Sequence, residues 1–315
     1  MNKKVFACDM DGTLLDSSGR ISPANKQALE LLRQIGYAVL LVSGRHPMLM
    51  LKSYRELGLS GPVIGCNGAF IYLPQDSAQG QQREPPKKPA NPAEQNHFEA
   101  LPTGLVSQLV ELARPYPLDV VLDCDCGLIK LRDQFSAFEN YPASPPFEIR
   151  QQSDYRLPEE RDRDGNETGK KIRVCKVVFA AEGAGYQAKK HTENREEKEI
   201  QSRKHRALLE QLQQRVLEFG GLYPVFPEYL FLDIVDRNIN KLVGVQRVAQ
   251  QTKHLIAIGD GENDIPLLQA ANFSIAMGNA PDKVKQLAHH VTTHHDDDGL
   301  ARAVEYLENN GLLLF

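Results

Sequence analysis

Five short, largely apolar runs constrain the fold of this 315-residue chain more than any other feature. They lie near the two ends of the chain, at residues 5–8, 37–42, 63–66, 255–258 and 273–277. An apolar run without alternation is typical of a strand buried on both faces, as in a parallel sheet. An amphipathic helix is expected between the first two runs, over residues 23–35, with Ser22 as its cap. We therefore predict an α/β fold in which both ends of the chain build one doubly wound parallel sheet.

The middle of the chain does not continue this alternation. Residues 75–96 are rich in Gln, Pro, Lys and Glu, a composition that predicts a loop or linker. The elements expected beyond it are strands at residues 120–122, 128–131 and 174–180 and helices at 105–113 and 206–219. We interpret the charged stretches 153–171 and 182–204 as solvated loops or extensions rather than as a docking surface. The predicted organisation is a core of residues 1–80 and 229–315 with an inserted α/β domain of residues 81–228.

The composition argues against several classes of partner. The net charge of -4 gives no basic excess of the kind that nucleic-acid binders show, so no nucleic acid is expected as a partner. No apolar segment approaches the length of a membrane span, and residues 5–8 are too short for the core of a signal peptide. We therefore expect a cytoplasmic protein without a membrane partner. The five cysteines are odd in number and form no CxxC pair, which predicts reduced thiols.

Two carboxylates follow the first apolar run. Asp9 and Asp11 stand two positions apart in Asp-Met-Asp-Gly-Thr, where a strand gives way to a glycine turn, so both can address one site. Phosphoryl transfer requires an in-line nucleophile, a proton donor for the leaving oxygen and cations that neutralise the other phosphoryl oxygens. One aspartate can supply the nucleophile by forming an acyl phosphate, and the other can handle the proton.

Other polar residues follow the remaining strands, and sites in open parallel sheets form beyond the carboxyl ends of the strands. Ser43 offers a hydroxyl group for a phosphate oxygen, the backbone of Gly44 can approach closely, and Lys241 can supply a point charge. Residues 259–264 read Gly-Asp-Gly-Glu-Asn-Asp, a source of hard oxygen ligands for Mg2+. Carboxylates gathered this closely repel one another, so the acidic cluster itself implies a metal ion.

Taken in order, these four pieces resemble the four motifs of the haloacid dehalogenase superfamily of phosphatases. Residues 66–69, Cys-Asn-Gly-Ala, and 276–280, Ala-Met-Gly-Asn-Ala, are similar to its Cof subfamily. Members of that subfamily have a Rossmann-like core and a large α/β cap, of the C2 type, between the second and third motifs, where the inserted domain of this chain lies. One departure is at Lys241, which stands in Asn-Lys-Leu where the family usually has serine and glycine beside the lysine.

The resemblance implies a role for each matching residue. Asp9 would be the nucleophile and Asp11 the general acid and base, while Ser43 and Lys241 would hold the phosphoryl group. The implied ligands of Mg2+ are the Asp9 side chain, the Asp11 backbone carbonyl and Asp260, with Asp264 either a ligand through water or a partner of Lys241. The residues expected to contact the phosphate or the rest of the substrate are Gly44, Asn67, Gly68 and Asn263.

A stretch rich in histidine and aspartate near the end of the chain allows two interpretations. It comprises His289, His290, His294, His295 and Asp296 to Asp298. One interpretation is a metal site. The other, which we favour, is a solvated connection between a strand and a helix, in which an aspartate caps the final helix.

The leading functional hypothesis is a Mg2+-dependent phosphatase that hydrolyses a small phosphorylated metabolite, such as a sugar phosphate or pyridoxal phosphate, through an aspartyl-phosphate on Asp9. One alternative is a phosphosugar mutase or phosphotransferase of the same superfamily. Another is a regulatory protein that binds a ligand without turnover. The paired carboxylates argue against the second alternative, because a protein that only binds has no need of a nucleophile and an acid.

Overall fold

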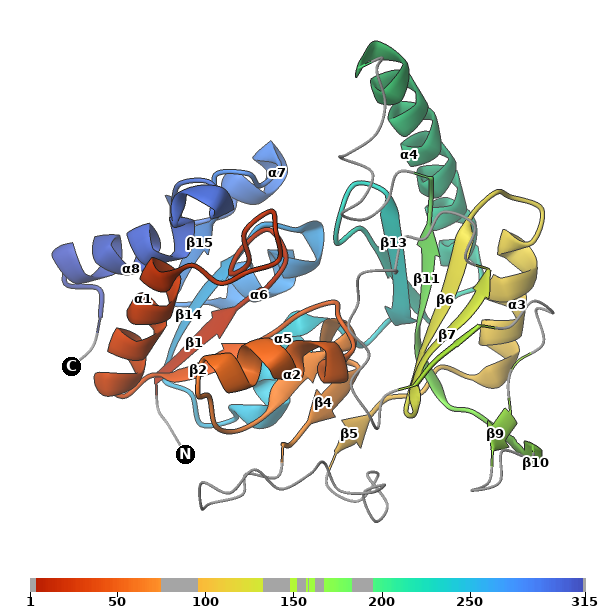
Figure 1. Cartoon of the computed structure of the whole chain (residues 1–315), viewed down its shortest axis with the longest axis horizontal. Helices are drawn as coiled ribbons and strands as arrows, with labels where there is room; N and C mark the ends of the chain where they lie inside the picture. Colours follow the sequence, from red (N-terminus) through yellow and green to blue (C-terminus); the bar gives the residue numbers. More distant parts are fainter. Residues whose placement is uncertain are drawn as a thin grey trace. The chain divides into compact units, whose positions relative to one another are not determined.

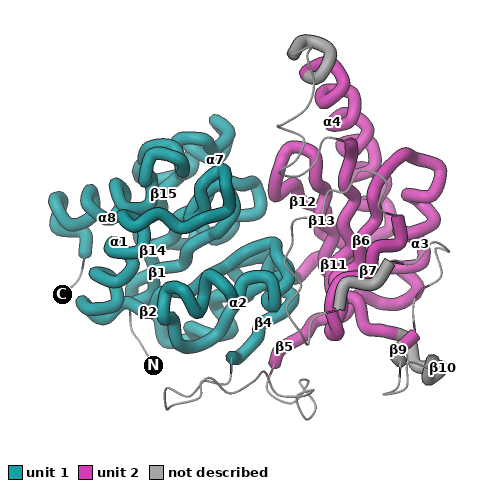
Figure 2. The backbone as a smooth tube through the Cα atoms, in the orientation of Figure 1, with its two compact units in different colours: residues 1–81, 239–315 teal, residues 82–238 magenta. Residues whose placement is uncertain are grey.

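The computed structural model describes residues 4–74, 96–132, 148–151, 157, 159–161, 167–182 and 195–313. The chain divides into two compact units, which Figure 2 shows in different colours. Unit 1 consists of residues 1–81 and 239–315, and unit 2 consists of residues 82–238. Almost all of the expected linker at residues 75–96 lies outside the described residues, as does most of the charged stretch 153–171.

Unit 1 contains a five-stranded sheet in which every neighbouring pair of strands is parallel, in the order β16-β15-β14-β1-β2. Its strands are β1 (Lys4–Cys8), β2 (Ala38–Leu41), β14 (His254–Gly259), β15 (Phe273–Ala276) and β16 (His290–Val291). Strand β1 lies between β2 and β14, so segments from both ends of the chain form one sheet (Figure 1). The predicted parallel sheet is confirmed.

Helices cover both faces of this sheet. Alternate residues of each strand point to opposite sides, so each strand contributes side chains to two separate cores. Phe6 and Cys8 belong to a core beneath one set of helices, α1 (Pro23–Gln34), α2 (Pro47–Glu56) and α8 (Gly299–Asn309). Val5 and Ala7 belong to a second core beneath α5 (Lys241–Val248), α6 (Ile265–Ala270) and α7 (Asp282–Lys285). The predicted cap of the first helix is present, since the Ser22 side chain accepts a hydrogen bond from the Asn25 backbone N–H.

A smaller antiparallel pair extends unit 1 beyond β2. Strands β3 (Val63–Gly65) and β4 (Phe70–Tyr72) are joined by the short 3-10 turn Cys66–Gly68. A parallel bridge between Val42 and Ile64 links β3 to the end of β2. The turn therefore lies beside the loop that follows β2.

Unit 2 is built around a six-stranded sheet in the order β12-β13-β11-β6-β7-β8. The strands are β6 (Asp119–Cys124), β7 (Gly127–Arg132), β8 (Glu148–Gln151), β11 (Val174–Ala180), β12 (Leu222–Val225) and β13 (Phe231–Asp236). Helix α3 (Thr103–Ala113) packs on β11, and α4 (Arg195–Glu218) packs on β12 and β13. The remaining elements are β5 (His97–Phe98) and the antiparallel pair β9 (Glu159–Arg161) and β10 (Glu167–Lys171). The inserted domain is thus α/β, as predicted.

Two boundaries differ from those expected. The second junction between the units lies at residues 238 and 239 rather than at 228 and 229, because β13 pairs with β11 and β12 of unit 2. Residues 195–204, part of a stretch expected to form a solvated loop or extension, belong to the helix α4. Apolar periodicity is weak there, but ion pairs four residues apart, such as Glu199 with Arg203, support a solvent-exposed helix.

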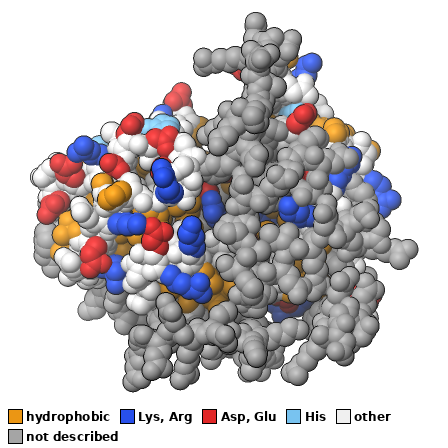
Figure 3. Space-filling model, in the orientation of Figure 1, with side chains coloured by type: hydrophobic (Ala, Val, Ile, Leu, Met, Phe, Trp, Pro, Cys, Tyr) orange, Lys and Arg blue, Asp and Glu red, His pale blue; other side chains and the backbone are white. Residues whose placement is uncertain are grey.

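The described surface of unit 1 carries charges of both signs. In the space-filling view of Figure 3, Lys and Arg side chains are interspersed with Asp and Glu side chains on the face shown. Within the described part of the chain, no helix combines the length and the apolar character needed to cross a membrane.

Candidate active site

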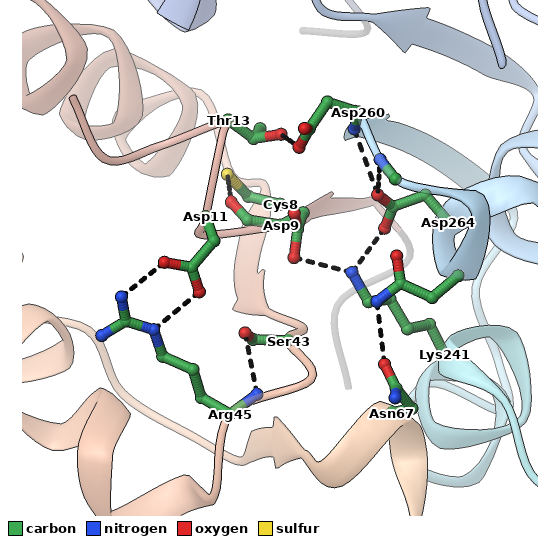
Figure 4. Close-up of polar contacts among 12 residues, drawn as sticks. Cys8, Asp9, Asp11, Thr13, Ser43, Arg45, Asn67, Lys241, Asp260 and Asp264 are labelled. Atoms are coloured by element: carbon green, nitrogen blue, oxygen red, sulfur yellow. Dashed lines mark hydrogen bonds and ion pairs between the residues drawn. The ribbon is translucent and has the colours of Figure 1, made fainter. Parts of the chain in front are cut away.

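Four segments of unit 1 meet beyond the carboxyl ends of its parallel strands, as Figure 4 shows. Asp9 follows β1, Ser43 lies in the loop after β2, and Asp260 follows β14. Lys241 is the first residue of α5. The sheet therefore gathers the motif residues from distant parts of the sequence.

Lys241 is at the centre of this cluster and is fully buried. Its Nζ atom donates to Asp9 Oδ1 at 2.6 Å and to Asp264 Oδ1 at 2.6 Å. Burial alone would lower the pKa of Lys241, but the negative charges of Asp264 and Asp9 raise it above the ordinary lysine value. Asn240, where the family usually has a different residue, caps α5 by accepting a hydrogen bond from the Val243 backbone N–H at 3.0 Å. The altered flank of the lysine thus still fixes the start of the helix.

The Asp9 and Asp260 carboxylates have pKa values above the ordinary value for aspartate. Burial, followed by the charge of Asp264, raises the pKa of Asp9 to about 7, while Lys241 acts in the opposite direction. Burial and the charges of Asp9 and Asp264 likewise raise the pKa of Asp260 well above its ordinary value. One lysine is therefore insufficient compensation for the negative charge in this cluster.

The cluster fits a divalent cation. Asp9, Asp260 and Asp264 offer carboxylate oxygens that lie within 4.8 Å of one another, and hard oxygen donors are the ligands that Mg2+ prefers. Three carboxylates gather here, and the one buried ammonium group contacts two of them, so a cation would restore the balance of charge. Gly12 lies against the Asp260 carboxylate and has a φ of +72°. A Cβ atom at this position would overlap the carboxylate. The glycine of the Asp-Met-Asp-Gly-Thr turn is thus required for the close approach of this carboxylate.

Asp260 is oriented by side chains from two other segments. Thr13 Oγ1 donates to its Oδ1 at 2.8 Å, and Asn279 Nδ2 donates to its Oδ2 at 3.2 Å. Asn279 Nδ2 also donates to the Gly12 carbonyl at 2.8 Å, and Asn279 Oδ1 accepts from the His295 backbone N–H at 3.1 Å. Sequence reasoning noticed the motif that contains Asn279 but gave this residue no part in the site.

Asp264 contacts Lys241, one of the two roles expected of it. Its other oxygen, Oδ2, accepts from the backbone N–H groups of Asp260 at 3.1 Å and Gly261 at 2.9 Å. Both oxygens therefore have partners within the protein. A role as a metal ligand through water stays a prediction.

The residues expected to contact the phosphate or the substrate lie around the same cluster. Asn263 Nδ2 donates to Asn67 Oδ1 at 2.9 Å, and both side chains are buried. Asn67 has φ 55°, and Gly68 lies against the Asn240 carbonyl, where a Cβ atom would not fit. The turn Cys66–Gly68 is thus packed against the start of α5. The contacts of these residues with a substrate stay predictions.

The loop after β2 contains one residue whose importance sequence reasoning missed. Ser43 Oγ accepts from the Arg45 backbone N–H at 3.1 Å across Gly44. The Arg45 side chain, to which the sequence analysis assigned no role in the site, forms an ion pair with Asp11. The sequence did contain a signal for this role of Arg45. Arg45 is a cation that closely follows β2, and β2 is the neighbour of β1, the strand that precedes Asp9 and Asp11. His46 instead caps α2 by accepting from the Met48 backbone N–H at 3.2 Å.

The histidine and aspartate stretch near the chain end forms hydrogen bonds with the loop that follows Thr13. Asp296 accepts from the Ser17 backbone N–H at 2.6 Å, and His295 Nδ1 lies 2.7 Å from the Leu15 carbonyl oxygen. The expected aspartate cap of the final helix is wrong. Asp298 occupies the capping position of α8 but has φ 56° and makes no capping hydrogen bond with its side chain. Its backbone is left-handed, whereas a residue that caps a helix with its side chain is usually extended.

With this geometry described, comparison with known proteins places the chain in a family. The family model of haloacid dehalogenase-like hydrolases matches residues 6–91 and 106–304, so the chain belongs to that family. The resemblance inferred from the motifs is confirmed. A solved haloacid dehalogenase-like hydrolase from Bacillus subtilis has the same fold, with a TM-score of 0.70 at 20% identity, over 96% of this chain and 99% of that one.

Two curated relatives match along nearly the whole chain. The 5-amino-6-(5-phospho-D-ribitylamino)uracil phosphatase YitU of Bacillus subtilis is 25% identical over 302 residues, which cover 95% of each chain. The pyridoxal phosphate phosphatase YbhA of Escherichia coli is 25% identical over 310 residues, covering 96% of this chain and 98% of that protein.

Proposed function

We propose that this hydrolase is a Mg2+-dependent phosphatase that cleaves a small phosphorylated metabolite through an aspartyl-phosphate on Asp9. One observation carries the proposal: the buried ammonium group of Lys241 joins Asp9 to Asp264 at the carboxyl ends of the strands, beside Asp260. This arrangement presents a carboxylate nucleophile next to a fixed positive charge. The two curated relatives are both named as phosphatases of phosphorylated metabolites.

In the first half-reaction, an Asp9 carboxylate oxygen attacks the phosphorus atom and forms an acyl phosphate. The bond between phosphorus and the leaving oxygen breaks, and Asp11 donates a proton to that oxygen. Lys241 and Ser43 hold the phosphoryl oxygens during the transfer. Bound Mg2+ would neutralise charge on the same oxygens, held by Asp9, Asp260 and the Asp11 backbone carbonyl.

In the second half-reaction, a water molecule attacks the phosphorus atom of the aspartyl-phosphate. Asp11, now ionised, takes a proton from this water. The bond between phosphorus and the Asp9 oxygen breaks, which releases inorganic phosphate and restores the Asp9 carboxylate. Asp11 is protonated again and ready for the next substrate.

The substrate class is a small phosphomonoester. The names of the two relatives point to a ribitylaminouracil phosphate and to pyridoxal phosphate. We propose sugar phosphates, expected from the motifs, as a further class for this site. We propose that unit 2 is the cap that selects among such molecules. A polar metabolite suits a site whose buried residues include Asn67 and Asn263.

The proposal is tested by incubating the purified full-length protein with Mg2+ and a panel of phosphorylated metabolites and measuring free phosphate. We expect release that stops with a chelator and falls by about a thousandfold or more in Asp9→Asn, because the nucleophile is lost. Asp282→Asn, which changes an exposed carboxylate on α7, is the matched control and should behave like the wild type. Unchanged phosphatase activity in Asp9→Asn would contradict the proposal. An isomerised phosphosugar without free phosphate would indicate a mutase instead.

A further inference from the structure

The side chain of Asp11 is bound by Arg45 through both of its carboxylate oxygens. Arg45 Nε donates to Asp11 Oδ2 at 2.6 Å, and a terminal guanidinium nitrogen donates to Asp11 Oδ1. In Figure 4 the Asp11 carboxylate points toward Arg45, whereas the Asp9 carboxylate points toward Lys241. Two parallel hydrogen bonds of this kind fix the orientation of a carboxylate as well as its position.

Arg45 itself is held by a rigid stretch of backbone. Its N–H donates to Ser43 Oγ at 3.1 Å, and its carbonyl accepts from the Cys66 N–H at 2.8 Å. A Cβ atom at Gly65 would overlap this carbonyl, so the loop after β2 and the end of β3 are packed without spare room. Asp11, by contrast, keeps 21% of its side chain exposed. Arg45 therefore supplies the orientation that burial does not.

Both oxygens of Asp11 are held by Arg45 without being closed off. Each oxygen accepts one guanidinium hydrogen bond, and a carboxylate oxygen has a second lone pair that is still available to a water molecule. Because 21% of the Asp11 side chain is exposed, a water molecule can reach it while Arg45 holds it. The pose is thus one in which the Asp11 carboxylate can act as a base toward water.

We propose that Arg45 is a positioning residue for the second half-reaction. It holds the Asp11 carboxylate so that one of its oxygens can take the proton of the hydrolytic water, while the guanidinium group itself does not touch the reacting atoms. The inference depends on the proposed function, since it needs an aspartyl-phosphate to hydrolyse. It assigns to Arg45 an effect on the hydrolysis step alone.

The experiment separates the two half-reactions with p-nitrophenyl phosphate, whose leaving group departs without a proton donor. The value of kcat/KM reports the steps up to release of p-nitrophenolate, and kcat includes hydrolysis of the phosphoenzyme. For Arg45→Met we expect a burst of p-nitrophenolate close to one per active site, then a steady rate about tenfold or more below that of the wild type. kcat/KM should change by less than about threefold. Acid-quenched protein should contain covalently bound phosphate.

Four further variants complete the test. Arg45→Lys keeps the charge but not the paired contact, so its steady rate should lie between those of Arg45→Met and the wild type. If Arg45 acts through Asp11, adding Arg45→Met to Asp11→Asn should slow hydrolysis no further. Arg55→Met, which changes an exposed arginine of α2, should leave both half-reactions unchanged.

The outcomes distinguish this inference from the proposed function. If the wild type releases no phosphate from any ester, the proposed function fails first. If the wild type is active but kcat and kcat/KM of Arg45→Met fall together without a burst, Arg45 instead serves substrate binding or phosphoryl transfer, and the inference is wrong. An unchanged kcat in folded Arg45→Met and Arg45→Lys proteins would overturn it as well.

Discussion

At the scale of single residues, the site is dominated by charge that the protein alone does not balance. Lys241 is buried between Asp9 and Asp264, and Asp260 lies beside them. Buried charges cost free energy unless they are paired, and a cluster with excess negative charge is retained only where something compensates for it. In the metal-free protein, protons supply part of that compensation, as the raised pKa of Asp9 shows.

This imbalance predicts a dependence of stability on pH. The pKa of Asp9 is about 7 in the folded state, against an ordinary value of 3.8, so the folded state binds the proton more tightly than the unfolded state. The metal-free wild type should therefore lose stability, relative to Asp9→Asn, as the pH rises from about 4 to about 7. The difference should be on the order of 4 kcal/mol above that window.

Thermal unfolding of the two proteins in chelator, followed by circular dichroism across this pH range, checks the prediction. The variant should have the higher Tm at neutral pH, and the two values should converge near pH 4, about the ordinary pKa of the group. Adding Mg2+ should raise the Tm of the wild type more than that of Asp9→Asn, because a ligand of the ion is lost. A Tm difference that does not vary with pH would contradict the assignment.

At the scale of elements, the sheet of unit 2 contains a buried ion triad at its centre. Lys176 on β11 lies 3.0 Å from an oxygen of Asp123 on β6 and 3.1 Å from an oxygen of Asp233 on β13. The three side chains are buried, and register places Lys176 directly opposite Asp123. The lysine therefore links three adjacent strands through side-chain contacts in addition to the backbone ladder.

Lys176→Met should destabilise the protein by about 3–5 kcal/mol, because it leaves two buried carboxylates without their common cation. Adding Asp123→Asn and Asp233→Asn should recover part of this loss, since neutral amides do not need the cation. The measurement is urea unfolding of the full-length chain followed by circular dichroism. Lys253→Met, at an exposed position, is the control and should stay within about 0.5 kcal/mol of the wild type. An equally small effect of Lys176→Met would show that the triad contributes little.

At the scale of the whole molecule, the two units differ in how the chain builds them. Unit 2 is one continuous segment, whereas unit 1 needs both ends of the chain because β1 pairs with β2 on one side and β14 on the other. Helices α5, α6 and α8 also come from the second segment of unit 1. Without that segment, β1 would expose a strand edge and apolar side chains on both faces.

This difference predicts unequal behaviour of fragments. A chain of residues 82–238 alone should fold, unfold cooperatively on heating and release no phosphate, because it has its own sheet and core. A chain of residues 1–81 alone should not fold, because half of its core partners are missing. Circular dichroism and thermal unfolding of the two chains check both parts. A cooperative transition in residues 1–81 would contradict the explanation.

Local sequence patterns were sufficient for the parts of the protein that depend on local physics. Continuous apolar runs identified β1, β2 and β14, because strands buried on both faces are composed mostly of apolar residues. The motif order then located Asp9, Ser43, Lys241 and Asp260 at strand ends. The start of α4 was missed, because its stability comes from charged pairs on an exposed surface rather than from an apolar stripe.

The sequence by itself thus determined the class of fold, the family and the set of motif residues. Each of these depends on short stretches of sequence with a recognisable period or spacing. Only the tertiary structure decided that Arg45 binds Asp11, that Asn279 and Thr13 share the Asp260 carboxylate, and that Lys176 joins three strands. These contacts join residues between 19 and 247 positions apart or lie between strands whose register no local pattern specifies. Their partners are chosen by the packing of the sheet and its loops, and a single sequence does not contain that information in any local form.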